Sequence, residues 1–95
     1  MGFEHAKRQI LDALRAGAVE HDVRGEGKNL LALGLVDVTA AIELIERTRG
    51  QEARASAHHA DPSVEVWVFR PRGWYIKFYH RRVWRFASFH REGEP

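Results

Sequence analysis

Apolar and polar residues alternate most regularly between positions 64 and 90. Three runs of β-branched and aromatic residues lie there, separated by Pro-Arg-Gly at 71–73 and by Arg-Arg at 81–82. The runs hold all three Trp, both Tyr and four of the five Phe residues of the chain. Short alternating runs divided by turn residues predict a meander of three antiparallel strands.

The first turn sets the expected register of the meander. Pro71 and Gly73 are typical of a three-residue hairpin loop in which the glycine is left-handed. This loop places Val68 opposite Ile76, whereas a two-residue loop would place it opposite Tyr75 and exchange the two faces. We prefer the three-residue loop because it gathers one apolar face. That valine-rich face, which we expect to pack against the core, contains Val64, Val66, Val68, Trp74, Ile76, Phe78, Ala87 and Phe89.

The opposite face is rich in aromatic residues and also carries polar ones. If the arginines at 81–82 form a two-residue turn, Tyr75 lies opposite Ser88 and His90 is the next residue outward on the same face. The full set is Glu65, Trp67, Phe69, Tyr75, Lys77, Tyr79, Trp84, Phe86, Ser88 and His90. This face is either a second packed layer or a surface that stacks bases and neutralises phosphates of single-stranded RNA. The mixture of rings with cationic and proton-transferring groups favours RNA.

Helical periodicity occurs twice before the meander. Apolar residues recur at spacings of three and four near the start of the chain, which predicts a helix over residues 3–16. A second helix is expected from Asp37 or Thr39, either of which can cap it, to about Arg49. Its apolar stripe should lie on the valine-rich face of the sheet.

The segments between these elements are less informative. Residues 19–29 are polar and contain glycines, which indicates a loop, and residues 51–62 either extend the second helix or form an irregular arm. We therefore expect an α+β fold, with two main helices packed on one face of a small antiparallel sheet of three strands, and room for one short extra strand. A length of 95 residues fits a single domain over residues 1–95.

Composition and charge narrow the possible partners. The chain has no cysteine, which excludes disulfides and thiolate metal sites and fits a reducing compartment. No long apolar run or signal peptide is visible, so we expect a cytoplasmic protein without a membrane partner. The net charge is only +2, but Lys and Arg outnumber Glu after residue 64, whereas acidic residues outnumber basic ones before it. A basic sheet suggests a polyanionic partner.

Cleavage of RNA requires few protein groups. The substrate's 2′-hydroxyl is the nucleophile, so the protein supplies a base, an acid and cations for the transition state. Tyr75, Lys77 and His90 offer these groups on one face, with Trp67 and Tyr79 as candidates to contact the bases. The six histidines lack the i, i+4 helical spacing of a metal site, so we expect no metal and no cofactor.

Several short motifs, in their order and spacing, resemble those of one toxin family. They are Ala16-Gly17-Ala18-Val19, Leu33-Gly34-Leu35, Phe69-Arg70-Pro71, Tyr75-Ile76-Lys77 and Ser88-Phe89-His90. The chain resembles the MqsR toxins, which are mRNA endoribonucleases of bacterial toxin–antitoxin pairs. The resemblance implies a RelE-like fold, cleavage of single-stranded mRNA without a metal, and a cognate antitoxin as partner.

The resemblance also implies active-site roles for individual residues. Tyr75 matches the family's active-site tyrosine, while His90 and Arg54 fall where the family has active-site lysines. Val66 stands where the family has a polar glutamine, so that contact is missing here. Histidine remains a competent acid or base near neutral pH.

We therefore predict catalytic roles for four residues and substrate binding for four others. His90 transfers the proton at the 2′-oxygen or the leaving 5′-oxygen, and Tyr75 orients the phosphate or shares the proton transfer. The catalytic set is Tyr75, His90, Lys77 and Arg54, and the substrate-binding set is Arg70, Trp67, Tyr79 and His58. The alternatives are a non-catalytic RNA-binding module, or an interaction protein that uses the aromatic face.

Overall fold

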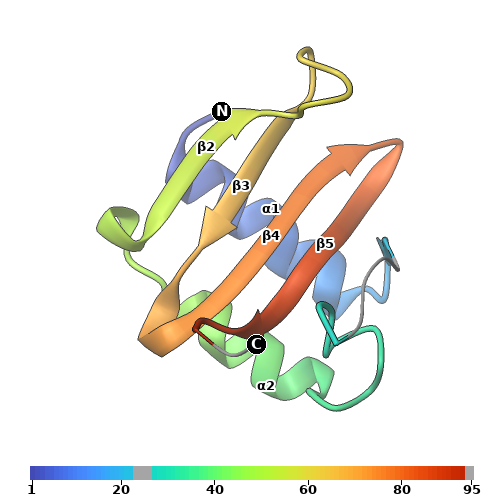
Figure 1. Cartoon of the computed structure of the whole chain (residues 1–95), viewed down its shortest axis with the longest axis vertical. Coiled ribbons are helices and arrows are strands. Elements are labelled where there is room, and N and C mark those ends of the chain that lie inside the picture. Colours follow the sequence, from blue (N-terminus) through green and yellow to red (C-terminus); the bar gives the residue numbers. More distant parts are fainter. Residues whose placement is uncertain (23–26, 94–95) are drawn as a thin grey trace.

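Five strands form one mixed sheet, and both helices lie on the same side of it (Figure 1). The computed structural model describes residues 1–22 and 27–93. In chain order the elements are α1 (Phe3–Arg15), β1 (Val19–His21), α2 (Val38–Glu46), β2 (Ala53–Ala57), β3 (Glu65–Phe69), β4 (Trp74–Arg81) and β5 (Val83–Arg91), with short 3-10 turns η1 (Gly50–Glu52) and η2 (Pro71–Gly73). The strand order is β1-β5-β4-β3-β2. The expected α+β class is confirmed, but the sheet is larger than the predicted meander.

The two helices form largely where their apolar stripes predict them. Asp37 caps α2, since its Oδ1 accepts a hydrogen bond of 2.7 Å from the backbone N–H of Ala40. The helix ends at Glu46, short of the predicted end at Arg49. Of the two caps proposed from the sequence, Asp37 is therefore the one used.

Two edge strands arise in segments that the sequence does not mark as strands. β1 lies in the predicted loop and pairs in parallel with β5, whereas β2 lies in the ambiguous segment and pairs antiparallel with β3. Alanine and serine dominate β2, and they have little intrinsic preference for strands. Both strands form because neighbouring strands offer free backbone groups. The part of the predicted loop at 23–26 lies outside the described residues.

The β3–β4 hairpin has a different register from the predicted one. Phe69 lies opposite Ile76 and Val68 opposite Lys77, so the side chains of β3 are exchanged between the two faces. The reason lies in the turn, where Arg72 (φ 52°) and Gly73 (φ 80°) are both left-handed. A three-residue loop with one left-handed glycine cannot account for this geometry.

The β4–β5 hairpin also departs from the expected two-residue turn. Arg81 pairs with Val83, which leaves Arg82 alone at the tip, and a β-bulge interrupts the ladder opposite Lys77 and Phe78. The bulge shifts the register by one residue. The predicted pairs Ile76–Ala87 and Tyr75–Ser88 are therefore wrong, and the observed pairs are Ile76–Phe89 and Tyr75–His90.

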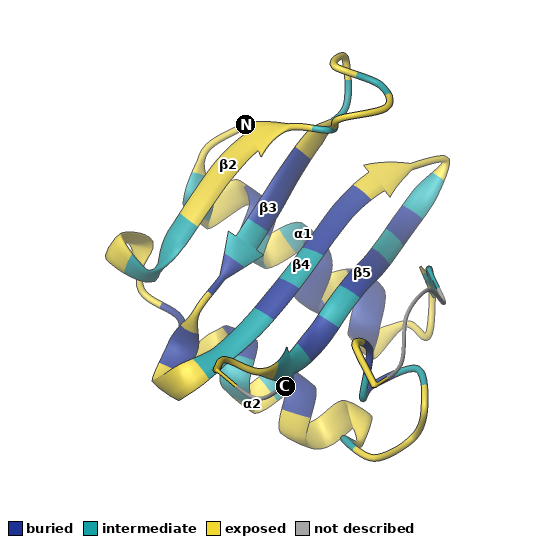
Figure 2. Ribbon diagram, in the orientation of Figure 1, coloured by how far each residue is buried: buried dark blue, intermediate teal, exposed yellow. Residues whose placement is uncertain are grey.

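The core consequently draws on residues from both predicted faces of the sheet. Figure 2 shows buried residues along β3, β4, β5 and the inner sides of the helices. Ala41 and Ile45 of α2 pack in one cluster with the sheet residues Trp67, Phe69, Ile76, Phe78, Trp84, Phe86 and Phe89. The predicted core face is therefore correct for Ile76, Phe78 and Phe89, and wrong for Val66 and Val68, which lie on the opposite face. Burying large rings removes more apolar surface from water than burying valines would.

Candidate functional site

The face of the sheet that the helices leave uncovered carries most of the predicted site residues. We call it the open face; its side chains include Arg54, Ser56, Val66, Val68, Tyr75, Lys77, Tyr79, Arg85, Ser88 and His90. They form rows across the strands. One row runs from Arg54 through Val68 and Lys77 to Ser88, and the next contains Tyr75 and His90. Neighbouring side chains in a row stand about 5 Å apart.

Tyr75 and His90 lie directly opposite each other on β4 and β5. Their rings stack, with 5.2 Å between ring centroids and 21° between the planes. The Nδ1 of His90 lies 2.9 Å from the backbone carbonyl oxygen of Arg91, which can only accept a hydrogen bond. Nδ1 therefore carries a hydrogen, and Nε2 of the neutral ring is the free basic nitrogen. The Tyr75 hydroxyl has no hydrogen-bond partner within the described residues.

Arg70 connects this pair to the β3–β4 turn. Its guanidinium carbon lies 5.4 Å from the centroid of the Tyr75 ring, and its Nε is 3.3 Å from a carboxylate oxygen of Glu92. The ion pair is exposed, so it contributes little to stability. Its effect is to hold a cation over the outer surface of the Tyr75 ring.

Lys77 and Arg54 are two further cations of the open face. In the described part of the chain, Lys77 and Arg54 form no ion pair with a carboxylate. Arg54 and Arg70 line a recess of about 340 Å³, and Lys77 lines a smaller one of about 100 Å³. Ser56 borders both recesses, so they adjoin. The arrangement suits a negatively charged ligand.

His58 and Tyr79 lie further along the same face. The two rings meet edge to face at 5.0 Å, and His58 also stacks on His59 at 5.0 Å. Tyr79 is 6% exposed, so only its rim can contact a ligand. His58 borders the Lys77 recess and remains placed for the predicted role in substrate binding.

Trp67 is the one predicted site residue that lies elsewhere. The corrected register places it on the helix-covered face, where it is 6% exposed and belongs to the core cluster. Its Nε1 donates a hydrogen bond of 3.0 Å to the Glu65 carboxylate. The prediction that Trp67 shares a face with Tyr75 and His90 is therefore wrong. The remaining seven predicted residues share the face or its rim.

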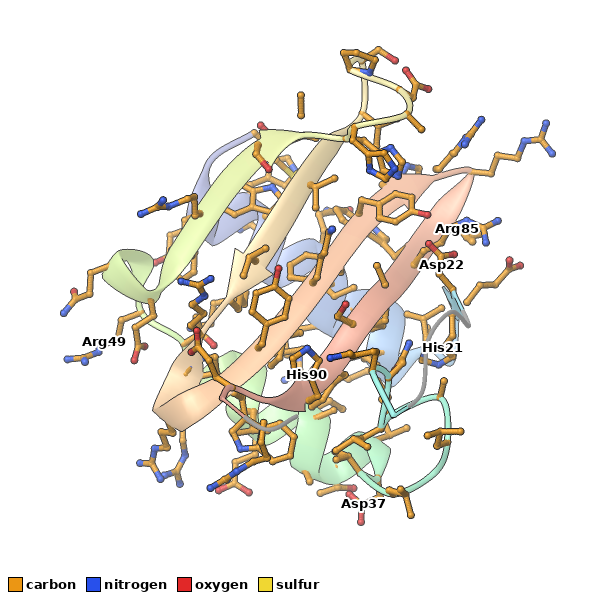
Figure 3. The ribbon with its side chains drawn as sticks, viewed as in Figure 1. His21, Asp22, Asp37, Arg49, Arg85 and His90 are labelled. Atoms are coloured by element: carbon orange, nitrogen blue, oxygen red, sulfur yellow. The ribbon has the colours of Figure 1, made fainter. Side chains whose placement is uncertain are left out.

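A cluster at the β4–β5 hairpin escaped the sequence analysis. The Tyr79 hydroxyl donates a hydrogen bond to Asp22, and Arg85 forms ion pairs with Asp22 (3.8 Å) and Glu20 (3.1 Å). Figure 3 shows Asp22 and Arg85 together, well away from His90. Asp22 follows β1, and its approach to Arg85 depends on the parallel pairing of β1 with β5. The only sequence signal was the concentration of arginines at 81, 82 and 85.

Burial changes the acid–base behaviour of a nearby histidine. Desolvation lowers the pKa of His21, and the negative charge of Asp22 opposes this effect. The ring stacks on Phe86 at 5.9 Å, and its Nδ1 accepts a hydrogen bond from the Asn29 amide at 3.4 Å. His21 therefore favours the neutral form and belongs to the packed side of the sheet.

Metal binding and membrane insertion are two other possibilities for residues 1–22 and 27–93. No group of three or more His, Asp or Glu side chains in these ranges could hold a metal ion. No helix in the same ranges is long and apolar enough to cross a membrane.

The chain was also compared with protein families, with curated proteins and with solved structures. None of the three comparisons found a match.

Proposed function

We propose that this protein is an endoribonuclease that cleaves single-stranded RNA without a metal ion. The observation that carries the proposal is the stacked pair of Tyr75 and His90 beside Lys77 and Arg54, two cations that form no ion pair within residues 1–22 and 27–93. Transfer of the phosphoryl group to the 2′-hydroxyl requires a general base, a general acid and cations that bind the phosphate. All four side chains lie on the face that the helices leave open.

The proposed reaction begins with removal of the 2′-hydroxyl proton by Nε2 of His90. The 2′-oxygen then forms a bond to phosphorus, and the bond from phosphorus to the 5′-oxygen breaks. Tyr75 donates the proton that the departing 5′-oxygen takes up, and His90 returns a proton to Tyr75 through solvent. The products are a 2′,3′-cyclic phosphate and a 5′-hydroxyl.

The cations act on the charge that develops during the reaction. Lys77 and Arg54 approach the phosphate from one row of the sheet, and Arg70 approaches from above the Tyr75 ring. They stabilise the additional negative charge of the five-coordinate transition state. Where the toxin family has a lysine, Arg54 offers the several N–H donors of a planar guanidinium group.

The biological setting that we propose follows from the resemblance to MqsR toxins. The protein would act in the bacterial cytoplasm on mRNA, and a cognate antitoxin would block it. Expression of the active enzyme without an antitoxin should then slow growth. Variants that lack His90 should be tolerated.

The direct test is cleavage of an end-labelled single-stranded RNA in the presence of EDTA. We expect the wild-type protein to cleave, and we expect His90→Ala and Tyr75→Phe each to lower the rate about a hundredfold or more, as loss of a proton-transfer group does. Product ends should be a cyclic phosphate and a 5′-hydroxyl.

The matched control is His5→Ala, which removes an exposed histidine from α1 on the opposite side of the sheet. It should cleave at the wild-type rate. Equal cleavage by the wild type and both site variants would refute the proposed catalytic pair. RNA binding without any cleavage would support the non-catalytic RNA-binding module instead.

A further inference from the structure

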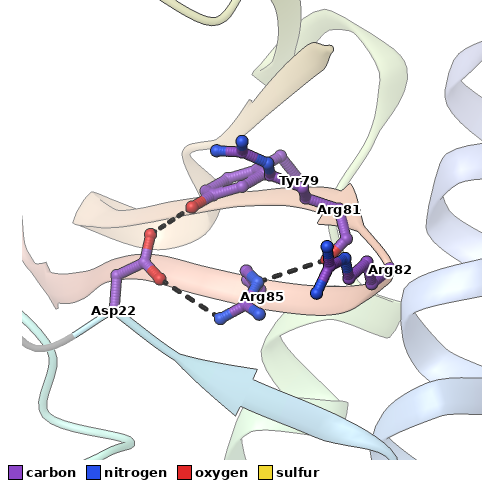
Figure 4. Close-up of a pocket in the computed structure, with 5 residues that line it drawn as sticks. All are labelled: Asp22, Tyr79, Arg81, Arg82 and Arg85. Carbon is purple, nitrogen blue, oxygen red and sulfur yellow. Dashed lines mark hydrogen bonds and ion pairs between the residues drawn. The ribbon is translucent and has the colours of Figure 1, made fainter. Parts of the chain in front are cut away.

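A third recess lies on the open face, at the β4–β5 hairpin (Figure 4). It has a volume of about 400 Å³ and is lined by Asp22, Tyr79, Arg81, Arg82 and Arg85. Tyr79 and Arg85 are opposite each other across β4 and β5, and Arg81 follows Tyr79 on the same face. The recess thus collects three arginines beside a tyrosine.

Within the described residues, the carboxylates around this recess form ion pairs with one of its three arginines, and Asp61 interacts with Arg81 only through longer-range electrostatics. Asp22 and Glu20 hold Arg85, and the Nε of Arg85 donates a hydrogen bond of 3.3 Å to the backbone carbonyl of Arg81. Arg81 and Arg82 form no ion pair with any carboxylate in the part of the chain described. The recess therefore has an excess of positive charge, with one guanidinium held by carboxylates and two that form no ion pair within the described residues.

The backbone of Arg82 is unusual for its residue type. Its φ of 69° lies in the left-handed region, which glycine adopts far more easily than arginine. Non-glycine residues in such conformations cluster at ligand-binding sites. The hairpin tip therefore carries a guanidinium at a position where glycine would be less strained.

The distance along β4 relates this recess to the Tyr75–His90 pair. Tyr75 and Arg81 are separated by six residues of one strand, which corresponds to roughly 20 Å. Lys77 and Tyr79 lie between them on the same face. An extended single strand of RNA covers this distance in a few nucleotides.

We propose that the open face binds single-stranded RNA along β4, with a second phosphate-binding site formed by Arg81, Arg82 and Arg85. This inference rests on the proposed function, because it takes Tyr75 and His90 as the place of the scissile phosphate. The substrate is therefore a chain of several nucleotides rather than a dinucleotide. The hairpin site adds affinity and sets the register of the RNA on the enzyme.

Binding of 2′-O-methyl RNA tests the inference separately from cleavage, since this RNA has no nucleophile. Fluorescence anisotropy is measured with oligonucleotides from a dinucleotide to a decamer. We expect affinity to rise once the RNA is long enough to reach from Tyr75 to the hairpin. We expect Arg82→Gly with Arg81→Gln to lower the affinity for the decamer about tenfold, as loss of charged hydrogen bonds does, and to reduce its salt dependence. Affinity for the dinucleotide should not change.

The matched control is Arg72→Gly. Arg72 is the other arginine with a left-handed backbone (φ 52°), and it lines a different recess with Arg47, Arg49 and Glu52. The change removes one positive charge, where the hairpin variant removes two, and it relieves a left-handed arginine at the other end of β4, outside the proposed second site. Affinity for the decamer should therefore fall no more than twofold.

The outcomes separate this inference from the proposed function. Equal losses in the hairpin variant and in Arg72→Gly, or no dependence on RNA length, would overturn the second phosphate site even if the enzyme cleaves RNA. Length-dependent binding that requires Arg81 and Arg82 would support the site even if the cleavage assay fails.

Discussion

Two histidines on the open face hold opposite tautomers. The Nδ1 of His90 donates to the Arg91 carbonyl, whereas the Nδ1 of His58 accepts a hydrogen bond of 3.1 Å from the backbone N–H of Ala60. In the neutral ring, His90 therefore presents a basic Nε2, and His58 presents an Nε2–H donor. His90 is suited to remove a proton, while His58 is suited to donate a hydrogen bond to a phosphate or a base. The hydrogen-bonded backbone, and not the residue type, makes this distinction.

His21 should make stability depend on pH. Burial lowers its pKa in the folded state, so the unfolded chain binds a proton first as the pH falls below about 6.5. The stabilisation is complete above that pH and is lost as the pH falls through the lower pKa of the folded state. Urea unfolding at pH 7.5 and 5.5 should show a larger loss of unfolding free energy in the wild type than in His21→Gln. An identical pH dependence in the two proteins would contradict the assignment.

At the scale of elements, the β3–β4 turn decides what the sheet presents on each side. The left-handed Arg72 and Gly73 change the register by one residue, and because side chains alternate, every residue of β3 changes face. Phe69 is completely buried under the helices, whereas Val68 is half-buried on the open face. The short Val68 side chain stands between Arg54 and Lys77 and leaves room for a ligand above it.

Two alanine substitutions test this register. Phe69→Ala should lower the unfolding free energy by about 3–5 kcal/mol, because it leaves a cavity in the core. Val68→Ala should cost about 1 kcal/mol or less, since Val68 lies on the surface of the sheet. Chemical denaturation of both variants measures the difference. The reverse order of stability would favour the register with a valine-rich core.

At the scale of the whole molecule, the sheet has a stable centre and two weaker edges. β4 pairs with both β3 and β5, and its inner face is buried against the core. β1 has only three residues, and β2 is mostly exposed. The proposed site uses the rigid centre for Tyr75, Lys77 and His90, and places only Arg54 on an edge strand.

Hydrogen exchange should reveal this difference in stability between the central strand and the edge strands. Backbone amides in the middle of β4 should exchange most slowly, because their opening requires separation from two strands, while amides of β1 and β2 should exchange fastest among the strands. Exchange followed by mass spectrometry of peptides, at neutral pH, measures the order. Protection of β2 equal to that of β4 would show that another chain covers this edge.

Much of the architecture could be predicted from local patterns in the sequence. The apolar stripe of the first helix, the Asp37 cap and the three strong strands depend on residue spacing and turn chemistry within a few positions. Tyr75 and Lys77 were correctly predicted to share a face, because residues two apart on a strand do so. His90 was also placed on that face, because its observed pairing differs from the predicted one by two residues, which leaves the face unchanged.

The tertiary structure decided the rest. β1 and β2 form through pairing with distant strands, so their own residues carry little signal of it. The register of β3 depends on the turn, and the wrong turn assigned Trp67 to the open face. The approach of Asp22 to Arg85 depends on the parallel pairing of β1 with β5. The sequence alone determined which residues carry chemistry and how they alternate, whereas long-range pairing and the burial of the largest rings determined which face they share.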